Sequence, residues 1–307
     1  MLFTGSGCFA QTDSLSNPYI QRFEDKISTQ LYMLNTTNQF TLNYEQENTT
    51  VDLVPNQRTT LGISVQYDFI SFGFGFAPKF FADNKDNKDS KMTTYSLTMF
   101  PGRWMQHFDF IYQKGISLET SGVSLYYPGL KTMKLGGSTA YVFNKNYSFR
   151  ALAFQSERQL KSAGSFAPQL SYYYTELNGN KTEELKGKSY FIDMALSPAY
   201  HYNWVIAKKF LVGGGISLGG GITYMNDEGD DETHFLATAS LSVSIGYNSE
   251  TFYGGIYSKG VASNHNTESK VEMNDAMNYG TVFFGYRFNA PKAVTREKNK
   301  IKDKYKL

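Results

Sequence analysis

The sequence contains a single cysteine, Cys8, among 307 residues, which excludes a disulfide framework and a cysteine-based zinc site. It lacks any stretch near the roughly 18 consecutive apolar residues of a membrane-spanning helix, so a helical membrane protein is excluded. Charged residues are scarce at 19% of the chain, below the roughly 25% of typical soluble domains. Aromatic residues, in contrast, reach 16% through 24 Phe and 23 Tyr. This composition excludes disorder and leaves open a membrane protein that spans by strands.

Alternation of apolar and polar residues is the dominant pattern, and it is clearest between Phe235 and Tyr247. The odd-numbered positions there are apolar, whereas most even-numbered positions are Thr, Ser or Gly. Because successive side chains of a strand point to opposite faces, one face is apolar and the other small and polar. The pattern recurs over 60–69 and 210–222. It is typical of strands that face lipid on the outside and a polar lumen on the inside.

Similar runs along the chain predict an all-β fold, an antiparallel transmembrane β-barrel of about twelve strands within a range of about ten to fourteen. Tight turns alternate with longer polar loops, which predicts short periplasmic turns and long extracellular loops. The loop over 158–187 is the weak point, because 166–174 also reads as a strand. A pair of soluble β-sandwiches is the alternative fold, and it would need second sheets to cover the apolar faces. The predicted strands are roughly 38–47, 58–68, 72–81, 91–100, 106–115, 132–142, 147–157, 188–202, 209–222, 233–247, 250–261 and 277–288.

The first residues resemble the end of a secretory signal peptide. Cys8 and Ala10 place small residues at the two positions that a signal peptidase reads, with Gln11 as the first mature residue. A lipoprotein signal at Cys8 is the alternative, although Gly5 stands where Leu would be expected. We therefore predict an exported protein of the outer membrane of a Gram-negative bacterium.

This interpretation divides the chain into four parts. We expect a signal-peptide remnant over 1–10, a periplasmic N-terminal segment with a short amphipathic helix or plug over 11–37, the barrel over 38–288 and a basic periplasmic tail over 289–307. An even number of strands places both termini in the periplasm.

Three short motifs resemble those of a known family. Val54-Pro55-Asn56, Tyr112-Gln113-Lys114-Gly115 and the run from Arg158 to Phe166, together with Tyr67 near a strand end, are similar to domain-of-unknown-function family 4421 of Bacteroidetes outer membranes. The resemblance covers nearly all of the mature chain. It implies an outer-membrane β-barrel, and it supplies no activity, substrate or catalytic residue.

Five polar residues are predicted to face the lumen near the periplasmic strand ends. Alternation places His107 and Asp109 inward on one strand, and Asp68, His201 and Arg287 inward on others. They would form one charged cluster. Since the lumens of small barrels are filled by side chains, we expect this cluster to brace and plug the base. The functional alternative is a proton-sensitive gate or a substrate contact.

The sequence shows no catalytic or metal-binding motif, because it lacks a GxSxG elbow, an HExxH motif and a P-loop. The glycine triplets at 213–215 and 219–221 lie inside an alternating strand and are read as barrel bends or as room for neighbouring side chains. We therefore predict a protein that is not an enzyme and needs no cofactor. Its role is either a plugged structural or interaction subunit of an envelope assembly or a small-solute channel. An outer-membrane enzyme acting on lipid is the alternative.

The C-terminal tail is strongly basic, with a net charge of +5 over 292–307 in a chain whose net charge is +2. Besides outer-membrane lipid around the barrel, its partners would be inner-leaflet phosphates, an anionic cell-wall polymer or an acidic protein of the periplasm or outer membrane. Nucleic acid is excluded as a partner by the export signal. A disordered solubilising tail is an equal alternative. The basic residues are Lys292, Arg296, Lys298, Lys300, Lys302, Lys304 and Lys306.

Overall fold

The computed structural model describes residues 17–44, 49–55, 58–81, 84, 91–120, 123–154, 156–179, 187–227, 230–266 and 271–305. The predicted signal peptide lies outside these residues. The strands are β1 (Ile20–Arg22), β2 (Lys26–Tyr44), β3 (Thr49–Pro55), β4 (Arg58–Tyr67), β5 (Ile70–Phe76), β6 (Lys91–Met99), β7 (Trp104–Thr120), β8 (Val123–Tyr141), β9 (Glu157–Gln159), β10 (Ala163–Phe166), β11 (Gln169–Asn178), β12 (Lys188–Ser197), β13 (Ala199–Ile206), β14 (Phe210–Asp227), β15 (Asp230–Asn248), β16 (Phe252–Asn266) and β17 (Val271–Asn289). The helices are α1 (Phe149–Leu152) and α2 (Lys292–Tyr305).

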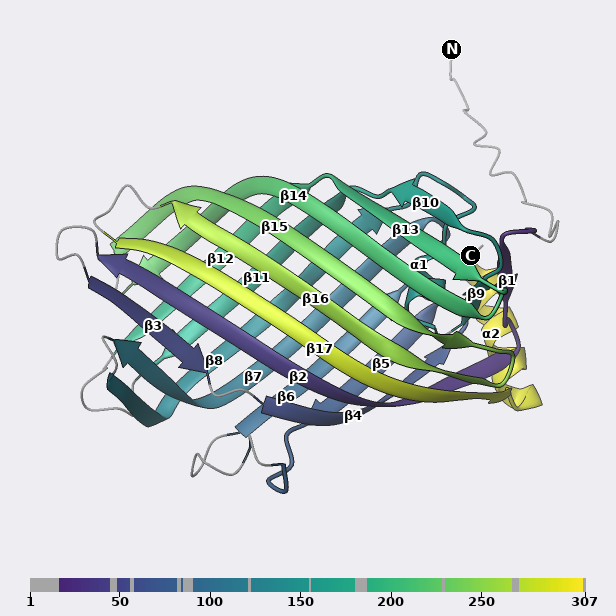
Figure 1. The fold of residues 1–307 in the computed structure, drawn as a ribbon, viewed down its shortest axis with the longest axis horizontal. Coiled ribbons are helices and arrows are strands. Elements are labelled where there is room, and N and C mark those ends of the chain that lie inside the picture. Colours follow the sequence, from purple (N-terminus) through teal and green to yellow (C-terminus); the bar gives the residue numbers. More distant parts are fainter. Residues whose placement is uncertain are drawn as a thin grey trace, which may run out of the picture.

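Fifteen of the strand segments form one antiparallel sheet that closes on itself through the pairing of β17 with β2 (Figure 1). Three pairs of segments are each one interrupted strand. Proline has no N–H for the ladder, and Pro168 separates β10 from β11 while Pro198 separates β12 from β13. Residues 56–57 separate β3 from β4, both of which pair with β2. The ring therefore has twelve strands, which confirms the predicted barrel and excludes the sandwich alternative.

The outside of the ring is apolar, as the alternation predicts. Leu218 is 71% exposed, Ile216 59% and Leu241 58%, although all three are large aliphatic side chains. The polar partners on the same strands point inward, and Ser242 and Ser244 are buried. So many exposed aliphatic side chains around a closed antiparallel ring indicate lipid on the outside, because closure removes the sheet edges that cannot be paired in a bilayer.

One part of the wall departs from a simple ring. The hairpin of β5 and β6 is short, and above it β3 pairs directly with β7 over Pro55–Ile116 to Asp52–Glu119. The register of β7 shifts at Gly115, which has a φ of +86°, where β7 leaves β6 and meets β3. Nearby, Asn84 donates to the carbonyl oxygens of Thr59 at 2.8 Å and Pro78 at 2.7 Å. The ring is thus narrower toward the end opposite the termini.

Most of the predicted long loops are in fact continuous hairpins, which corrects the predicted loop pattern. The strands β2, β8, β15 and β17 each have 19 residues, about twice the length needed to cross a bilayer. The ladder of β14 and β15, for example, runs on to the Asp227–Asp230 pair, past the apolar alternation, so the hydropathy signal stops before the strands do. Likewise β2 begins at Lys26, and not at the predicted residue 38.

The strand predicted over 147–157 is wrong. The chain forms α1 there and then β9, and the seventh barrel strand is instead the interrupted β10–β11 pair. The described N-terminal segment and α2 both lie at the end of the barrel that carries the tight turns (Figure 1). We call this end the base, and it is the periplasmic end in barrels of this type.

Candidate functional site

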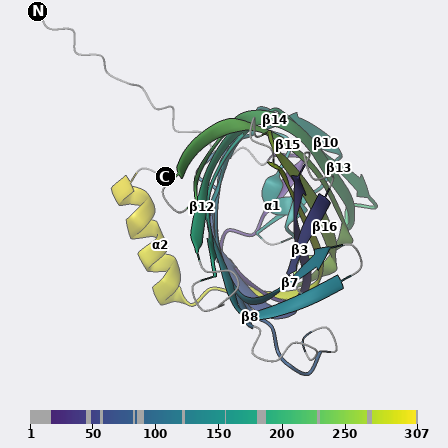
Figure 2. The ribbon, with the colours of Figure 1, turned by 90° about the vertical axis from the view of Figure 1, so that its left-hand side faces the viewer.

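The base of the barrel is filled by the connection between β8 and β10. We call the described part of residues 142–162 the plug; it contains α1 and β9 and folds back inside the ring, where Figure 2 shows α1. The short strand β9 pairs with β1 of the N-terminal segment, with Gln21 opposite Arg158. The N-terminal segment therefore contributes a strand to the plug, although it forms no helix over its described residues.

Local interactions define both ends of α1. Ser148 caps its first turn, and its side-chain oxygen accepts from the Ala151 backbone N–H at 3.0 Å. Shortly after the helix, Phe154 has a φ of +58°, a left-handed conformation that is uncommon for a bulky residue. The side chain of Phe154 is fully buried. Packing and hydrogen bonding thus hold the chain in a turn that it would otherwise avoid.

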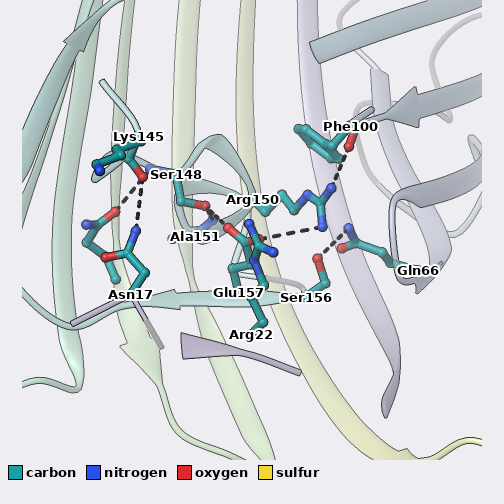
Figure 3. A network of polar contacts seen from close by, with 11 residues as sticks. Asn17, Arg22, Gln66, Phe100, Lys145, Ser148, Arg150, Ala151, Ser156 and Glu157 are labelled. Atoms are coloured by element: carbon teal, nitrogen blue, oxygen red, sulfur yellow. Dashed lines mark hydrogen bonds and ion pairs between the residues drawn. The ribbon is translucent and has the colours of Figure 1, made fainter. Parts of the chain in front are cut away.

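A buried carboxylate organises the inside of the plug (Figure 3). Glu157 is 5% exposed and lies 3.2 Å from Arg22 Nε and 3.5 Å from Arg150 Nη1. It also accepts from the Ser148 hydroxyl. Arg150 in turn donates to the carbonyl oxygen of Phe100 at the end of β6. Burial lowers the pKa of Arg150, and the carboxylate of Glu157 offsets part of this effect.

Arg287 on β17 ties the plug to the wall. Its side chain is 2% exposed and donates to the carbonyl oxygens of Phe154 and Ser249, each at 2.5 Å, and to Asn248 Oδ1 at 2.8 Å. Asn248 donates in turn to the Glu157 carbonyl oxygen at 3.3 Å. A guanidinium presents several donors in a fixed plane, so one side chain joins the plug, at Phe154, to the base turn at Asn248 and Ser249.

Aromatic rings complete the surroundings of Arg287. The guanidinium carbon lies 4.2 Å from the centre of the Phe23 ring and 4.4 Å from that of Tyr253, distances at which a cation is attracted by a ring face. Phe154 packs in the same region with Leu211 and Tyr253 in a buried apolar cluster. The plug is therefore held by both polar and apolar contacts.

Further wall strands bind the plug through neutral side chains. Fully buried Asn203 on β13 donates to the Ser148 carbonyl oxygen at 3.0 Å. Gln66 on β4 donates to Ser156 Oγ at 2.9 Å. The plug therefore contacts β4, β13, β15 and β17, on several sides of the ring.

Inward-facing glycines leave room for the plug. A Cβ built on Gly213 would lie 2.2 Å from Leu152 Cδ1, and one on Gly246 would lie 2.9 Å from the Phe154 ring. Such distances are too short for any real contact. This confirms that the glycines provide room for neighbouring side chains, and at the base the neighbours belong to the plug.

The five predicted lumen residues do not form one cluster. His201 packs its ring against Phe149 of α1, with ring centres 4.8 Å apart, and Arg287 binds the plug as described above. Asp68 lies in the tight turn between β4 and β5 with a φ of +52°. His201 and Arg287 therefore contact the plug, whereas Asp68 lies in a turn of the wall. That the five residues brace the base stays a prediction.

His107 and Asp109 are the pair that the sequence places together correctly. His107 Nε2 lies 2.9 Å from Asp109 Oδ2, and His107 Nδ1 lies 2.7 Å from Thr98 Oγ1. Their side chains are 31% and 23% exposed, so they line a part of the lumen that water reaches.

A second polar cluster, which the sequence does not predict, lies nearer the end of the barrel opposite the base. Buried His265 on β16 places Nε2 3.4 Å from Asp193 Oδ1 on β12, and Thr223 donates to the same carboxylate oxygen at 2.6 Å. Asp193 shares the alternation of His201, so its inward direction could have been predicted. The sequence predicts a loop at His265, whereas β16 extends to Asn266.

The basic tail forms α2 over Lys292–Tyr305, so the described part of it is not a disordered tail. Lys298 Nζ donates to Asp25 Oδ1 and to the Glu24 carbonyl oxygen, each at 3.1 Å, and lies over the Tyr67 ring. Of the other predicted residues, Lys292, Arg296 and Lys300 are exposed. The side chains of Lys302, Lys304 and Lys306 lie outside the described part of the chain.

Comparison with known proteins identifies the family. The model of a protein family described as a domain of unknown function, DUF4421, matches residues 11–288. The chain belongs to the DUF4421 family. No curated protein matches it. With the closed ring and its apolar outside, the chain is an outer-membrane β-barrel in contact with membrane lipid.

Several solved outer-membrane barrels are similar to this DUF4421 chain at low identity. The outer-membrane protease OmpT of Escherichia coli is 10% identical, with 87% of this chain and 98% of that chain covered and a TM-score of 0.33. An outer-membrane channel of Pseudomonas putida F1 is 8% identical, with 88% and 98% covered and a TM-score of 0.39. The toluene transporter TodX of Pseudomonas putida is 7% identical, with 85% and 89% covered and a TM-score of 0.32. Likenesses at this level say nothing of function.

Two other kinds of feature are missing from the described part of the chain. Within its residues, no helix is long and apolar enough to cross a membrane. The same residues contain no group of three or more His, Cys, Asp or Glu side chains arranged to hold a metal ion.

Proposed function

We propose that this outer-membrane barrel is closed at its periplasmic base by its own plug and serves as a structural or interaction subunit of the envelope. The observation that carries the proposal is the set of bonds from buried Arg287 to Phe154, Ser249 and Asn248. Of these partners only Phe154 belongs to the plug, and Asn248 also donates to the plug at the Glu157 carbonyl oxygen. Opening the base would break these two contacts between wall and plug and expose the buried Arg287 and Glu157 side chains. Buried polar groups that lose their partners cost free energy, so the closed base is the favoured state.

A small-solute channel is the second candidate. It is favoured by the partly exposed side chains of His107 and Asp109, which leave water-accessible space on the β6–β7 side of the lumen. On this view the plug narrows the passage without closing it, and the two titratable side chains select the solute.

We further propose that the protein is not an enzyme. In the Asp193 cluster the Thr223 hydroxyl donates to the carboxylate and not to the His265 ring. A hydroxyl nucleophile needs a base that accepts its proton, and a carboxylate placed between the two groups does not give that arrangement. An enzyme acting on lipid is therefore the weaker candidate.

Three further predictions concern the signal peptide, the source species and the partners of the protein. The family match begins at residue 11, the first residue of the predicted mature chain, which supports removal of residues 1–10 as a signal peptide. Origin from a Bacteroidetes species remains a prediction from the family resemblance. A periplasmic or outer-membrane protein partner, or a cell-wall polymer, also remains a prediction.

Solute permeability tests the proposed closure. The chain segments that enter and leave the plug lie side by side, as the two strands of a hairpin do, because Phe143 N donates to the Phe166 carbonyl oxygen at 3.2 Å. Replacing residues 146–163 by an Asn-Gly turn should therefore leave the wall intact. We expect liposomes with the natural chain to be impermeable to small sugars, and liposomes with the shortened chain to swell.

Both chains must first show the heat-dependent gel shift of a folded barrel. Equal and rapid swelling with the natural chain would support the channel and overturn the closed base. Equal impermeability of a folded shortened chain would show that the plug is not what closes the barrel.

A further inference from the structure

The helix α2 lies outside the barrel wall at the level of the base. In Figure 1 it is at the end of the strands, and in Figure 2, which looks along the barrel, it lies beside the ring and roughly perpendicular to the barrel axis. A helix in this position runs parallel to the membrane surface. Lys298 fixes it there through Asp25 and the Tyr67 ring, and the Tyr67 hydroxyl lies 3.4 Å from Thr295 Oγ1.

The apolar outside of the barrel ends next to this helix. Phe288 on β17 and Ile70 on β5 are the outward-facing apolar residues of these strands that lie nearest the base. They are 38% and 41% exposed. The helix begins four residues after Phe288, and Lys298 contacts Tyr67, which is paired with Ile70. Since the edge of the apolar belt marks the hydrocarbon boundary, α2 lies at the level of the lipid headgroups of the periplasmic leaflet.

The surface between α2 and the barrel base is a shallow open hollow of about 600 Å³. Three cations line it at i, i+4 and i+8 of the helix, so they form one stripe. Thr295 and Asn299 add a hydroxyl and an amide. Asp25 lines the hollow from the barrel side and is paired with Lys298 at 3.1 Å. Lys300 also pairs with Glu297 at 2.8 Å. The three cations are Lys292, Arg296 and Lys300.

We infer that this hollow binds the phosphate headgroup of an anionic phospholipid in the periplasmic leaflet. Three cations and two neutral donors match a phosphodiester with its glycerol hydroxyls, because phosphate oxygens accept both charged and neutral hydrogen bonds. The place of the hollow at the edge of the apolar belt lets the acyl chains of that lipid lie against the barrel. The helix would then anchor the rim of the base in one leaflet.

The test is a count of bound lipid by native mass spectrometry on the purified full chain in a non-ionic detergent. Phosphatidylglycerol and phosphatidylcholine are titrated separately onto the natural chain and onto the triple variant Lys292→Gln, Arg296→Gln, Lys300→Gln. Each basic residue near an anionic surface contributes about fivefold in affinity, so the triple variant should bind phosphatidylglycerol on the order of 100-fold more weakly.

A matched control removes the same charge from the same end of the barrel. Lys145, Lys208 and Lys209 are exposed at the base, and their replacement by Gln should change phosphatidylglycerol binding by less than about fivefold. The variant Lys292→Arg, Lys300→Arg should keep full binding, which separates loss of charge from loss of the fold.

Three results would overturn the inference. Equal losses in the helix and control variants would mean that the base attracts anions without a site. Unchanged binding in the helix variant would place the lipid elsewhere. Equal binding of phosphatidylglycerol and phosphatidylcholine by the natural chain would mean that the hollow does not select an anionic lipid.

Discussion

Buried polar residues line both the base of this barrel and the upper lumen, by which we mean the part around Asp193, Thr223 and His265. These residues have different partners in the two regions. At the base, wall side chains bind an independent segment: Arg287 donates to the Phe154 carbonyl oxygen and Gln66 to Ser156. In the upper lumen the described bonds join wall strands to one another, as between Thr223 and Asp193. Polar residues therefore hold a plug in one region and brace the wall in the other. The loss of a single contact should then have different consequences in the two regions.

The largest effect is expected at Arg287. Arg287→Met removes three hydrogen bonds and leaves their acceptors buried, which should lower the free energy of unfolding by about 4 kcal/mol. The measurement is urea-induced unfolding of the barrel in lipid vesicles. Arg103→Met is the matched control, since Arg103 is exposed and donates to the Val142 carbonyl oxygen; it should cost less than about 1 kcal/mol. Similar costs for the two variants would remove the special role of Arg287.

A smaller effect is expected where the wall makes room for the plug. Gly213→Val would place a side chain where Leu152 lies, and overpacking of this kind should cost about 2 kcal/mol. Gly280→Val is the control, because a Cβ on Gly280 meets nothing within 4 Å and faces lipid, so its effect should stay within about 0.5 kcal/mol. Faster solute entry through the Gly213 variant alone would locate the effect in the plug. If both variants unfold at the same urea concentration as the natural chain, the plug does not pack against β14.

The smallest effect is expected in the upper lumen. Asp193→Asn should lower the free energy of unfolding by about 1 kcal/mol, because it weakens the bonds to His265 and Thr223 and leaves the plug untouched. Glu232→Gln is the control, since Glu232 pairs with His234 at 2.7 Å but is 39% exposed; it should cost less than about 0.5 kcal/mol. Thermal unfolding and liposome swelling check both variants. An Asp193 variant that becomes permeable would contradict the division between the two regions.

The wall of the barrel was largely predictable from the sequence. The alternation over 235–247 assigns Leu241 and Val243 to the outside, and both are exposed there. Alternation works because lipid outside and a polar interior inside impose opposite requirements on neighbouring residues. The predicted strand count was correct for the same reason, although strand ends outside the bilayer were not visible in the hydropathy pattern.

The plug could not be predicted in the same way. Tyr147, Phe149 and Ala151 alternate with other residues as in a strand. Phe149 and Ala151 nevertheless lie in a helical turn, because Ser148 caps it and the segment is enclosed by the wall. Nothing in local sequence shows that a segment is surrounded on all sides. The sequence predicts that the Arg287 side chain points inward. Its partners come from the plug and from the turn at Ser249, and the sequence alone does not bring these segments together.

The most direct test of the closed base is single-channel recording in a planar bilayer. The natural chain is compared with the chain in which an Asn-Gly turn replaces residues 146–163, after both have shown the gel shift of a folded barrel. We predict no conductance steps from the natural chain and stable steps from the shortened chain. Stable steps of equal size from both chains would contradict the account, because the plug would then not close the barrel.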